Sequence, residues 1–185
     1  MHSKFFIWFV AGLWVLLVLY LTIAAFEVRK EENGHMAQRF ALLFAIIAAF
    51  ALPRLRVFAF VNFAPVNLTF SLIGTILCVA GMAFLVWGRV HLGRNWSQIV
   101  TLKQNHTLVT SGPYQYVRHP MYGGGIVACL GSAMVIGGPF VFLLFILGTL
   151  FLLRVRAEDE LLARHFPDEY PKYRKRTKAL IPFVW

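Results

Sequence analysis

Charged residues, and acidic ones above all, are scarce in this sequence of 185 residues. Only 14% of the residues are charged, with 8 Asp and Glu against 18 Lys and Arg, whereas 59% are hydrophobic, including 18 Phe and 5 Trp. This composition excludes a disordered chain, and a soluble domain of this size could not bury so much apolar surface in one core. The chain therefore needs lipid as a second solvent.

Cysteine is equally scarce, because the only two, Cys78 and Cys129, both lie inside apolar segments. The sequence thus offers no disulfide framework and no thiolate metal site, and His91, His106 and His119 do not have the spacing of metal ligands. Walker loops, Gly-x-Ser-x-Gly elbows and His-Glu-x-x-His motifs are also missing. We therefore expect no bound metal and two buried, inert thiols.

The net charge of +10 would suit a nucleic-acid partner if the basic residues formed a continuous surface. They instead avoid the apolar runs and gather in the connections and the C-terminal tail, as in membrane proteins with basic cytoplasmic loops. The sequence predicts a lipid bilayer, and no nucleic acid, as the partner. The basic run at 172–178 is expected to contact lipid headgroups.

Long runs without charge predict transmembrane helices. Residues 5–26 and 66–88 are each uncharged and long enough to cross a bilayer. The first run lacks the cleavage pattern of a signal peptide, so we interpret it as a retained span. The apolar segment at 39–62 is interrupted around Pro53 and is interpreted as a kinked or short span.

A second apolar region, 121–153, is too long for one crossing and contains Gly137-Gly138-Pro139, a turn signal, so it predicts a helical hairpin. The expected fold is an all-α membrane protein forming a single domain over 1–185, with about five transmembrane helices, a C-terminal helical hairpin and a cytoplasmic amphipathic tail. The predicted spans are about 5–26, 39–62, 66–88, 121–137 and 139–155.

The distribution of basic residues predicts the orientation. If the loop at 27–39, the stretch at 89–119 and the tail from 154 face the cytoplasm, that side holds 15 of the 18 Lys and Arg. We therefore expect an outside N-terminus and a cytoplasmic C-terminus in a multi-pass protein. The compact chain suggests a prokaryotic inner membrane.

The hairpin brings two polar flanks, 89–122 and 154–185, to the same side. In the first flank Gly112-Pro113 predicts a turn, and Pro120 suits the first turn of a helix. His119 would then lie at the positive end of that helix, near Arg118, where free amides can hold a carboxylate or phosphate. The alternative is that both residues only mark the membrane boundary.

The glycines that follow match the loosest dinucleotide-binding pattern, Gly123-x-Gly125-x-x-Ala128. No strand is predicted before them, so we expect them to allow close helix packing instead. Whether such a glycine-rich face packs within one chain or between chains stays open, and so does the oligomeric state.

In the second flank Arg154 and Glu158 are four residues apart, so they share one face of a helix near the lipid boundary. They could form a surface ion pair or part of a site, whereas Glu160 and Arg164 are expected to form only a surface pair. Pro167 and Pro171 are expected to end the helix.

Together the two flanks resemble the integral membrane isoprenylcysteine carboxyl methyltransferase family and its relatives, the phospholipid N-methyltransferases. The resemblance covers roughly the C-terminal hundred residues. The matching segments are Leu92-Gly93-Arg94-Asn95-Trp96-Ser97, His106-Thr107-Leu108-Val109-Thr110-Ser111-Gly112-Pro113-Tyr114, Val117-Arg118-His119-Pro120-Met121-Tyr122, and a tail with Glu158 to Phe166, Tyr170, Tyr173, Arg174 and Ile181-Pro182.

The resemblance implies an S-adenosyl-L-methionine pocket formed by the tail and the stretch before the hairpin. By similarity Glu158 and Arg154 would be the catalytic pair, with Glu158 also binding the cofactor and Arg154 placed near the methyl acceptor. The cofactor-binding residues implied by the resemblance are Thr101, His106, Thr107, Leu108, Val109, Tyr114, His119, Pro120, Met121, Tyr122 and Glu158.

The expected activity is methyl transfer to a lipid-like acceptor, with carboxyl O-methylation of an isoprenylcysteine-type or related substrate first among the possibilities. A phospholipid amine or a small thiol remains open as acceptor, and an amine would need a base such as Glu158 or a tyrosine. A non-catalytic scaffold or transporter subunit is the alternative of another class. A transporter is expected to bury ionisable residues in mid-span, and the clean spans have none.

Overall fold

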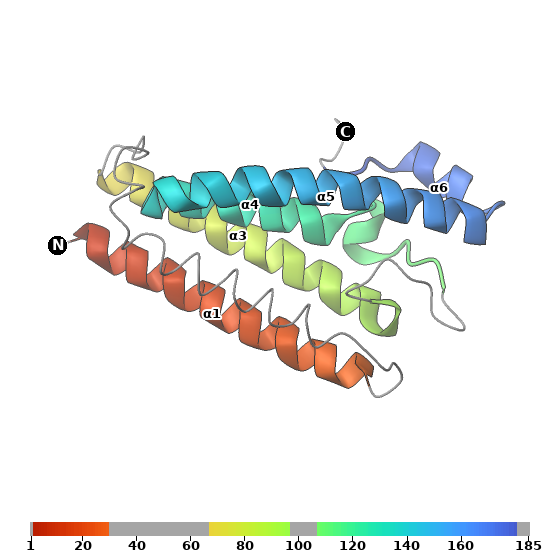
Figure 1. The fold of residues 1–185 in the computed structure, drawn as a ribbon, viewed down its shortest axis with the longest axis horizontal. Helices are drawn as coiled ribbons and strands as arrows, with labels where there is room; N and C mark the ends of the chain where they lie inside the picture. The colour runs from red at the N-terminus through yellow and green to blue at the C-terminus, as the bar shows by residue number, and fades with distance from the viewer. Residues whose placement is uncertain (1, 30–66, 97–106, 181–185) are drawn as a thin grey trace. The chain divides into compact units, whose positions relative to one another are not determined.

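This computed structural model describes residues 2–29, 67–96 and 107–180, and most of them lie in helices (Figure 1). The α-helices are α1 (His2–Arg29), α3 (Leu68–Leu92), α4 (Pro120–Ile136), α5 (Gly138–His165) and α6 (Tyr170–Arg176), with short 3-10 helices at Gly93–Asn95 and Gly112–Gln115. An isolated parallel bridge joins Val117 to Lys178. The predicted all-α class is confirmed for these residues.

Three helices in this part of the chain are long and apolar enough to cross a membrane: Lys4–Ala24 within α1, Leu68–Leu92, and Phe140–His165 within α5. The helix α4 is apolar as well but shorter, with 17 residues. The three candidate spans coincide in sequence with those predicted at 5–26, 66–88 and 139–155. A helix is present at the predicted span 121–137, but that α4 crosses the membrane stays a prediction, and the span predicted at 39–62 lies outside the described residues.

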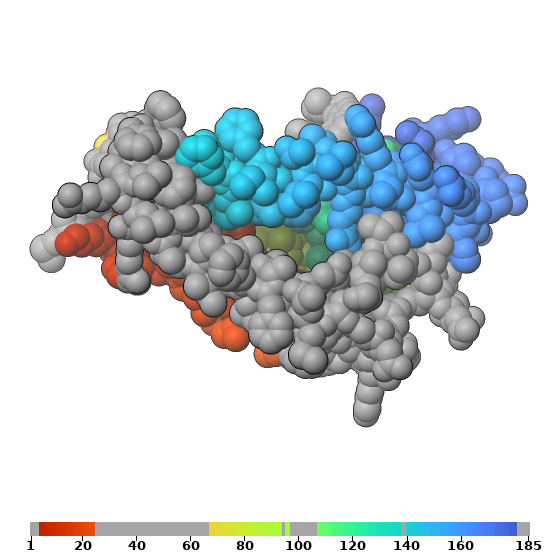
Figure 2. Space-filling view, viewed as in Figure 1, coloured from red at the N-terminus to blue at the C-terminus, as the bar shows by residue number. Residues whose placement is uncertain are grey.

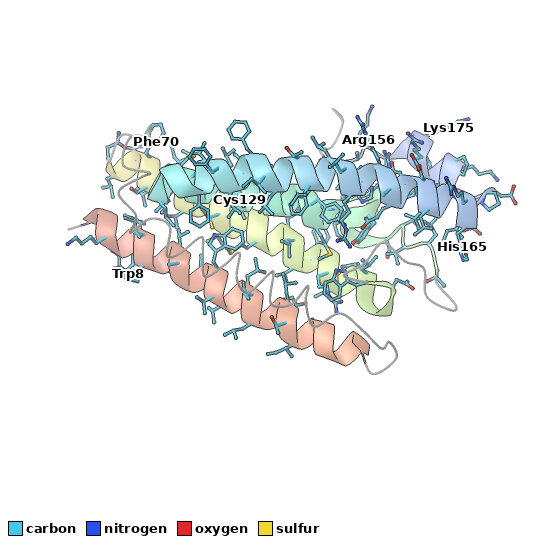
Figure 3. All side chains as sticks on the ribbon, in the orientation of Figure 1. Trp8, Phe70, Cys129, Arg156, His165 and Lys175 are labelled. Atoms are coloured by element: carbon cyan, nitrogen blue, oxygen red, sulfur yellow. The ribbon has the colours of Figure 1, made fainter. Side chains whose placement is uncertain are left out.

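Large apolar side chains cover the outer faces of these helices. Trp8 is 68% exposed, Ile76 66% and Phe145 72%, and Figure 3 shows Trp8 pointing away from α1. In Figure 2 the side chains of α5 lie open along the visible face. Such surfaces suit contact with lipid chains rather than with water, as expected for a multi-pass integral membrane protein.

Two helices continue beyond the ends of their predicted membrane spans. The helix α3 continues beyond 88 to Leu92 and ends at Gly93, whose φ of +52° is the left-handed conformation that commonly ends a helix. The helix α5 continues beyond its predicted span end at 155 to His165, because the segment after Arg154 is rich in the helix formers Ala, Glu, Leu and Arg. This continuation was predicted, since Arg154 and Glu158 were placed on one helix that ends before Pro167. Both extensions carry polar residues beyond the apolar runs.

The helices divide into two compact units. The first unit comprises 1–79 and 128–146. In it Gly131 of α4 lies directly against α3, since a Cβ at this position would fall 2.4 Å from the oxygen of Gly74 and 2.4 Å from the nitrogen of Cys78. Cys78 and Cys129 are both buried free thiols, as predicted.

A hydrogen-bonded serine ties α1 to this pair of helices. The indole of Trp14 donates to Oγ of Ser132 at 2.8 Å, and the Ser132 hydroxyl donates to the carbonyl of Ala128 at 2.8 Å. Because Ser132 is fully buried, these bonds satisfy a polar group that would otherwise be costly in an apolar interior.

The second unit comprises 80–127 and 147–185. Here a Cβ on Gly124 would lie 2.6 Å from the oxygen of Gly81, so α3 and α4 again approach through glycine. Gly125 faces the ring of Phe151 on α5. The prediction that the glycines of α4 serve close helix packing is confirmed, and this packing is within one chain.

The turn between α4 and α5 and the end of α5 before Pro167 were predicted correctly, whereas the prediction for Pro171 was wrong. Gly137, with φ of +87°, separates α4 from α5, so the predicted Gly-Gly-Pro turn is confirmed. Pro167 follows the end of α5 as predicted, but Pro171 does not end a helix. It lies in the first turn of α6, where the missing amide hydrogen has no helical partner to lose.

The helix α6 is amphipathic. Tyr170 and Tyr173 are buried on one side, whereas Lys172 and Lys175 are exposed on the other, and Figure 3 shows Lys175 pointing outward. The prediction of an amphipathic tail is confirmed in this helix, while the contact of its basic residues with lipid headgroups stays a prediction.

Candidate functional site

The entry into α4 is fixed by the tail of the chain. The amides of Arg118 and His119 donate to the carbonyls of Lys178 and Ala179 at 2.8 and 3.0 Å, and α4 begins at Pro120 as predicted. His119 therefore has a defined position immediately before the first turn of a helix that lacks acidic residues in that turn.

A tight turn precedes this entry. The predicted Gly112-Pro113 turn is a 3-10 helix, Gly112–Gln115. Gly112 has φ of +59°, and a Cβ there would lie 2.2 Å from the ring of His91. Only glycine fits this position, for both the backbone conformation and the contact.

The imidazole of His119 lies between two carboxylates. Its Nδ1 is 3.3 Å from Oε2 of Glu158, and its Nε2 is 2.8 Å from Oδ1 of Asp159. Burial opposes the charged form of this residue, which is 6% exposed, but the bonds to Asp159 and Glu158 outweigh burial and raise the pKa of His119 above its ordinary value. The ring also stacks on Tyr122, with centroids 5.6 Å apart.

The carboxylate of Glu158 is held by further donors. The hydroxyl of Tyr122 donates to Oε1 at 2.5 Å, and Nε of Arg154 donates to the same oxygen at 2.9 Å. The Glu158 side chain remains 24% exposed and that of Arg154 31%. The Arg154–Glu158 pair is thus part of a larger cluster and not an isolated surface pair.

The pair at Glu160 and Arg164 provides the contrast expected from the sequence. Its nearest nitrogen and oxygen are 4.0 Å apart, and the side chains are 71% and 82% exposed. It has the same spacing as Arg154 and Glu158, but it lies on the solvated side of α5. Such an exposed pair contributes little to stability.

The second carboxylate of the cluster, Asp159, was not among the predicted site residues. Besides His119 it binds Nη2 of Arg118 at 3.2 Å and accepts a short hydrogen bond from the hydroxyl of Tyr170. No local pattern in the sequence singles out Asp159, because its contacts depend on how α6 and the entry to α4 pack against α5.

Arg118 was expected near an anion held at the start of α4, but its side chain contacts the C-terminal tail of the chain. Its Nη1 donates to the carbonyl of Thr177 at 2.5 Å and approaches that of Arg174 at 3.4 Å. These carbonyls are at the end of α6, where a helix leaves carbonyls without helical partners. Arg118 therefore joins the tail to Asp159.

Other residues implied by the family resemblance surround this cluster. Tyr114 is 6% exposed, and its carbonyl accepts a hydrogen bond from Tyr173 at 2.7 Å. Burial raises the pKa of both phenols, so they remain neutral. Pro120 and Met121 each lie 3.1 Å from where a Cβ on Gly88 would be, which brings the end of α3 to the start of α4.

Asn95 and Thr107, which belong to two different segments of the family resemblance, are hydrogen-bonded to each other. The Asn95 amide donates to Oγ1 of Thr107 at 2.9 Å, and the Thr107 backbone amide approaches Oδ1 of Asn95 at 3.4 Å. Leu108 and Val109 follow as half-buried residues. Thr101 and His106, also predicted to bind the cofactor, lie outside the described residues.

The end of α3 contributes a buried cation that the sequence analysis did not single out. Arg89 is 6% exposed, donates to the carbonyl of Gly93 at 3.1 Å, and places its guanidinium carbon 4.4 Å from the ring centre of Trp96. The sequence feature that could have identified Arg89 is its place as a basic residue in the last turn of α3, where the helix dipole favours positive charge. Among the described residues, no group of three or more His, Cys, Asp or Glu could hold a metal ion.

These features define an integral membrane protein in which apolar helices end at a buried cluster of charged groups. The model of the isoprenylcysteine carboxyl methyltransferase family matches residues 73–164, about half of the chain. This region includes all of α4 and most of α3 and α5. The chain belongs to the isoprenylcysteine carboxyl methyltransferase family.

Curated relatives agree with this family. A protein-S-isoprenylcysteine O-methyltransferase of Schizosaccharomyces pombe is 36% identical over 130 residues, which are 64% of this chain and 53% of the relative. One of Saccharomyces cerevisiae is 28% identical over 164 residues, which are 86% of this chain and 67% of the relative. The chain thus spans about half of the first relative's length and about two thirds of the second's.

A solved structure shows the same fold. The eukaryotic intramembrane Ras methyltransferase ICMT superposes with a TM-score of 0.64 at 19% identity, covering 90% of this chain and 64% of that one. At this identity the likeness concerns the fold, which is that of an intramembrane helical protein.

Proposed function

We propose that this chain is an S-adenosyl-L-methionine-dependent methyltransferase that acts at the membrane on the carboxylate of an isoprenylcysteine-type or related lipid-like acceptor. The observation that carries the proposal is the carboxylate of Glu158, held by Tyr122, Arg154 and His119 where α5 leaves its apolar segment. The family match and the names of the curated relatives support the same activity.

The residues of the cluster fit the charges of the cofactor. S-adenosyl-L-methionine carries an ammonium, a carboxylate and a sulfonium, and the sulfonium supplies the methyl group. Glu158 offers an oriented, partly exposed anion for the ammonium, and the first turn of α4, which has no acidic residue, offers the positive end of a helix for the carboxylate. The remaining contacts follow the family resemblance, with Thr101, His106, Thr107, Leu108, Val109, Tyr114, Pro120, Met121 and Tyr122 around the cofactor.

The arrangement of Arg154 favours a carboxylate acceptor. Arg154 lies one helical turn before Glu158, directly after the apolar run of α5, where it can orient an anionic nucleophile at the edge of the membrane. A carboxylate is already deprotonated at neutral pH, whereas an amine needs a base. Glu158 is a poor base because its carboxylate already accepts hydrogen bonds from Tyr122 and Arg154 and pairs with His119.

The catalytic contribution of the protein in this proposal is positioning in a site of low dielectric. Charge is neutralised during methyl transfer from a sulfonium to a carboxylate, so partial exclusion of water favours the reaction. Exposed apolar faces such as that of α5 allow a lipid-like acceptor to approach from the bilayer. We further propose that one membrane domain over 1–185 carries the site, with the site and the C-terminus on the cytoplasmic side.

Cofactor binding provides the first test. Calorimetry of S-adenosylhomocysteine with detergent-purified protein should show saturable binding that Glu158→Ala and His119→Ala abolish. Glu160→Ala is the matched control, because it removes a neighbouring but exposed carboxylate, and it should bind as the wild type does. A folded wild-type protein that fails to bind would refute the methyltransferase proposal and leave a membrane scaffold.

Methyl transfer to matched acceptors provides the second test. We expect transfer to an S-prenylated cysteine with a free carboxylate, and none when the same compound is amidated. Transfer to phosphatidylethanolamine or to a small thiol, without transfer to the prenylated cysteine, would contradict the choice of acceptor while keeping the cofactor site.

A further inference from the structure

Asp159 connects three separate parts of the chain. Its Oδ1 accepts from His119 at the entry to α4 and from Tyr170 of α6, and its Oδ2 accepts from Arg118. The side chain is only 9% exposed. A buried carboxylate with this many partners is held as an anion in one orientation.

The contact with His119 has a consequence for the charge of the imidazole. A neutral imidazole donates through one nitrogen and presents a lone pair at the other. The ring of His119 has a carboxylate oxygen at each nitrogen, Asp159 on one side and Glu158 on the other. A lone pair facing an ionised carboxylate oxygen would be repulsive, so the geometry favours hydrogen on both nitrogens.

We propose that Asp159 is a positioning residue that keeps His119 protonated and thereby fixes Oε2 of Glu158 for the ammonium of the cofactor. This inference rests on the proposed function and adds a residue to it. Arg118 binds the other oxygen of Asp159, and Tyr170 donates to the same oxygen as His119. Without the charge of Asp159, Glu158 would be the one remaining anion beside the buried ring in the described part of the chain.

The charged and titratable groups facing His119 come from several elements. They are Glu158 and Asp159 of α5, with Arg154 and Tyr170 one contact further away, and Tyr122 of α4, whose ring stacks on the imidazole. The hydrogen bonds to both carboxylates raise the pKa of His119 against the effect of burial. Removing one of these anions should lower that pKa, so the effect of the substitution should depend on pH.

A purely structural role for Asp159 would have a different signature. If Asp159 only tied α6 and the α4 entry to α5, its loss would lower the melting temperature and weaken the cofactor equally at every pH. Asp159→Asn separates the two roles, because Asn has nearly the same shape and still accepts from the ring but carries no charge.

The test compares S-adenosylhomocysteine binding to wild type and Asp159→Asn at about pH 5.5 and about pH 8. At the lower pH we expect the two affinities to agree within about threefold. At the higher pH we expect the variant to bind about tenfold or more weakly than the wild type. This result is expected if loss of the charge lowers the pKa of His119 through the range between the two pH values. Glu160→Gln is the control for removing a carboxylate from the same turn, and it should behave as the wild type at both values. A loss that is equal at both pH values, or no loss, would overturn the proposal.

A second readout does not depend on the cofactor. The protonation of His119 can be followed by NMR of protein labelled with ¹³C-histidine, with its signal identified by comparison with His119→Gln. We expect a protonated ring in the wild type and a neutral ring in Asp159→Asn at about pH 8. An unchanged His119 signal in Asp159→Asn overturns the positioning role, whereas absence of wild-type cofactor binding with the expected NMR change overturns only the proposed function.

Discussion

Tyr122 and Glu158 are joined by a hydrogen bond of 2.5 Å between the phenol and Oε1, although 36 residues separate them in the chain. The same tyrosine stacks on Phe151, with ring centroids 4.8 Å apart. Phe151 and Glu158 are two helical turns apart, so both lie on the face of α5 that meets α4. Pairing of the two helices therefore places the carboxylate and its donor together.

Replacement of Tyr122 by Phe tests this donor without removing the ring. The variant keeps the stacking on Phe151 and His119 but leaves Glu158 without one of its hydrogen bonds. A hydrogen bond to a charged group is worth about 1.5–3 kcal/mol, so S-adenosylhomocysteine affinity should fall by roughly tenfold or more, measured by calorimetry.

Tyr116→Phe is the matched control for this substitution. Tyr116 is 49% exposed, so loss of its hydroxyl should leave affinity unchanged. If Tyr122→Phe binds as tightly as the wild type, Glu158 does not depend on the phenol for its orientation, and the assignment of Tyr122 to the site is wrong.

The sequence predicted the helices more fully than the contacts of the site. Apolar runs and turn residues were sufficient for α1, α3, α4 and α5, because length and hydropathy decide whether a helix can span a bilayer. Spacing placed Arg154 and Glu158 on one face, since both belong to one helix. Asp159 and Tyr170 were missed as site residues because their contact depends on how α6 folds back against α5, which no local pattern encodes.

The extent of α5 was predicted from two separate signals. Hydropathy ended the span near 155, and helix propensity continues to His165, before the predicted stop at Pro167. The ten residues beyond 155 include Glu158 and Asp159, so both carboxylates lie where α5 continues past its apolar run. The prediction that Pro171 ends a helix was wrong, because proline breaks a helix at interior positions but is favoured in the first turn of one.

Gly112 should not tolerate a side chain. Gly112→Ala would force alanine into φ of +59° and place its Cβ against the ring of His91, which should cost about 1–3 kcal/mol. We expect a lower melting temperature in detergent. Gly148→Ala is the control, because no atom lies within 4 Å of its Cβ position and alanine favours the helix. An equal melting temperature for both variants would contradict the turn geometry.

Adding His91→Ala to Gly112→Ala separates the two causes of the predicted loss. The double variant removes the collision but keeps the unfavourable φ, so it should recover part of the lost stability and not all of it. Full recovery would show that the backbone conformation at Gly112 costs nothing, and no recovery would show that His91 is not in contact.

The contact between α3 and α4 predicts a similar sensitivity at Gly131. A Cβ there would meet backbone atoms of Gly74 and Cys78 at 2.4 Å, and backbone cannot move aside as a side chain can. Gly131→Ala should therefore separate the helices and lower the melting temperature by several degrees, as overpacking of about 1–3 kcal/mol does. Gly12→Ala on α1 has open space around its Cβ position and should not be destabilised.

The pH dependence of stability should report the charge of His119. Because its pKa in the folded protein is raised, its stabilising contribution is fully present below the ordinary histidine pKa and is lost as pH rises through the folded value. The wild-type melting temperature should therefore be higher at about pH 6 than at about pH 9, by roughly 3 °C or more. His119→Gln should show a smaller difference over the same range, whereas substitution of the exposed His165 by Gln should leave the difference unchanged. If His119→Gln and the wild type lose stability in parallel, His119 is neutral in the folded protein and the two carboxylates do not hold its proton.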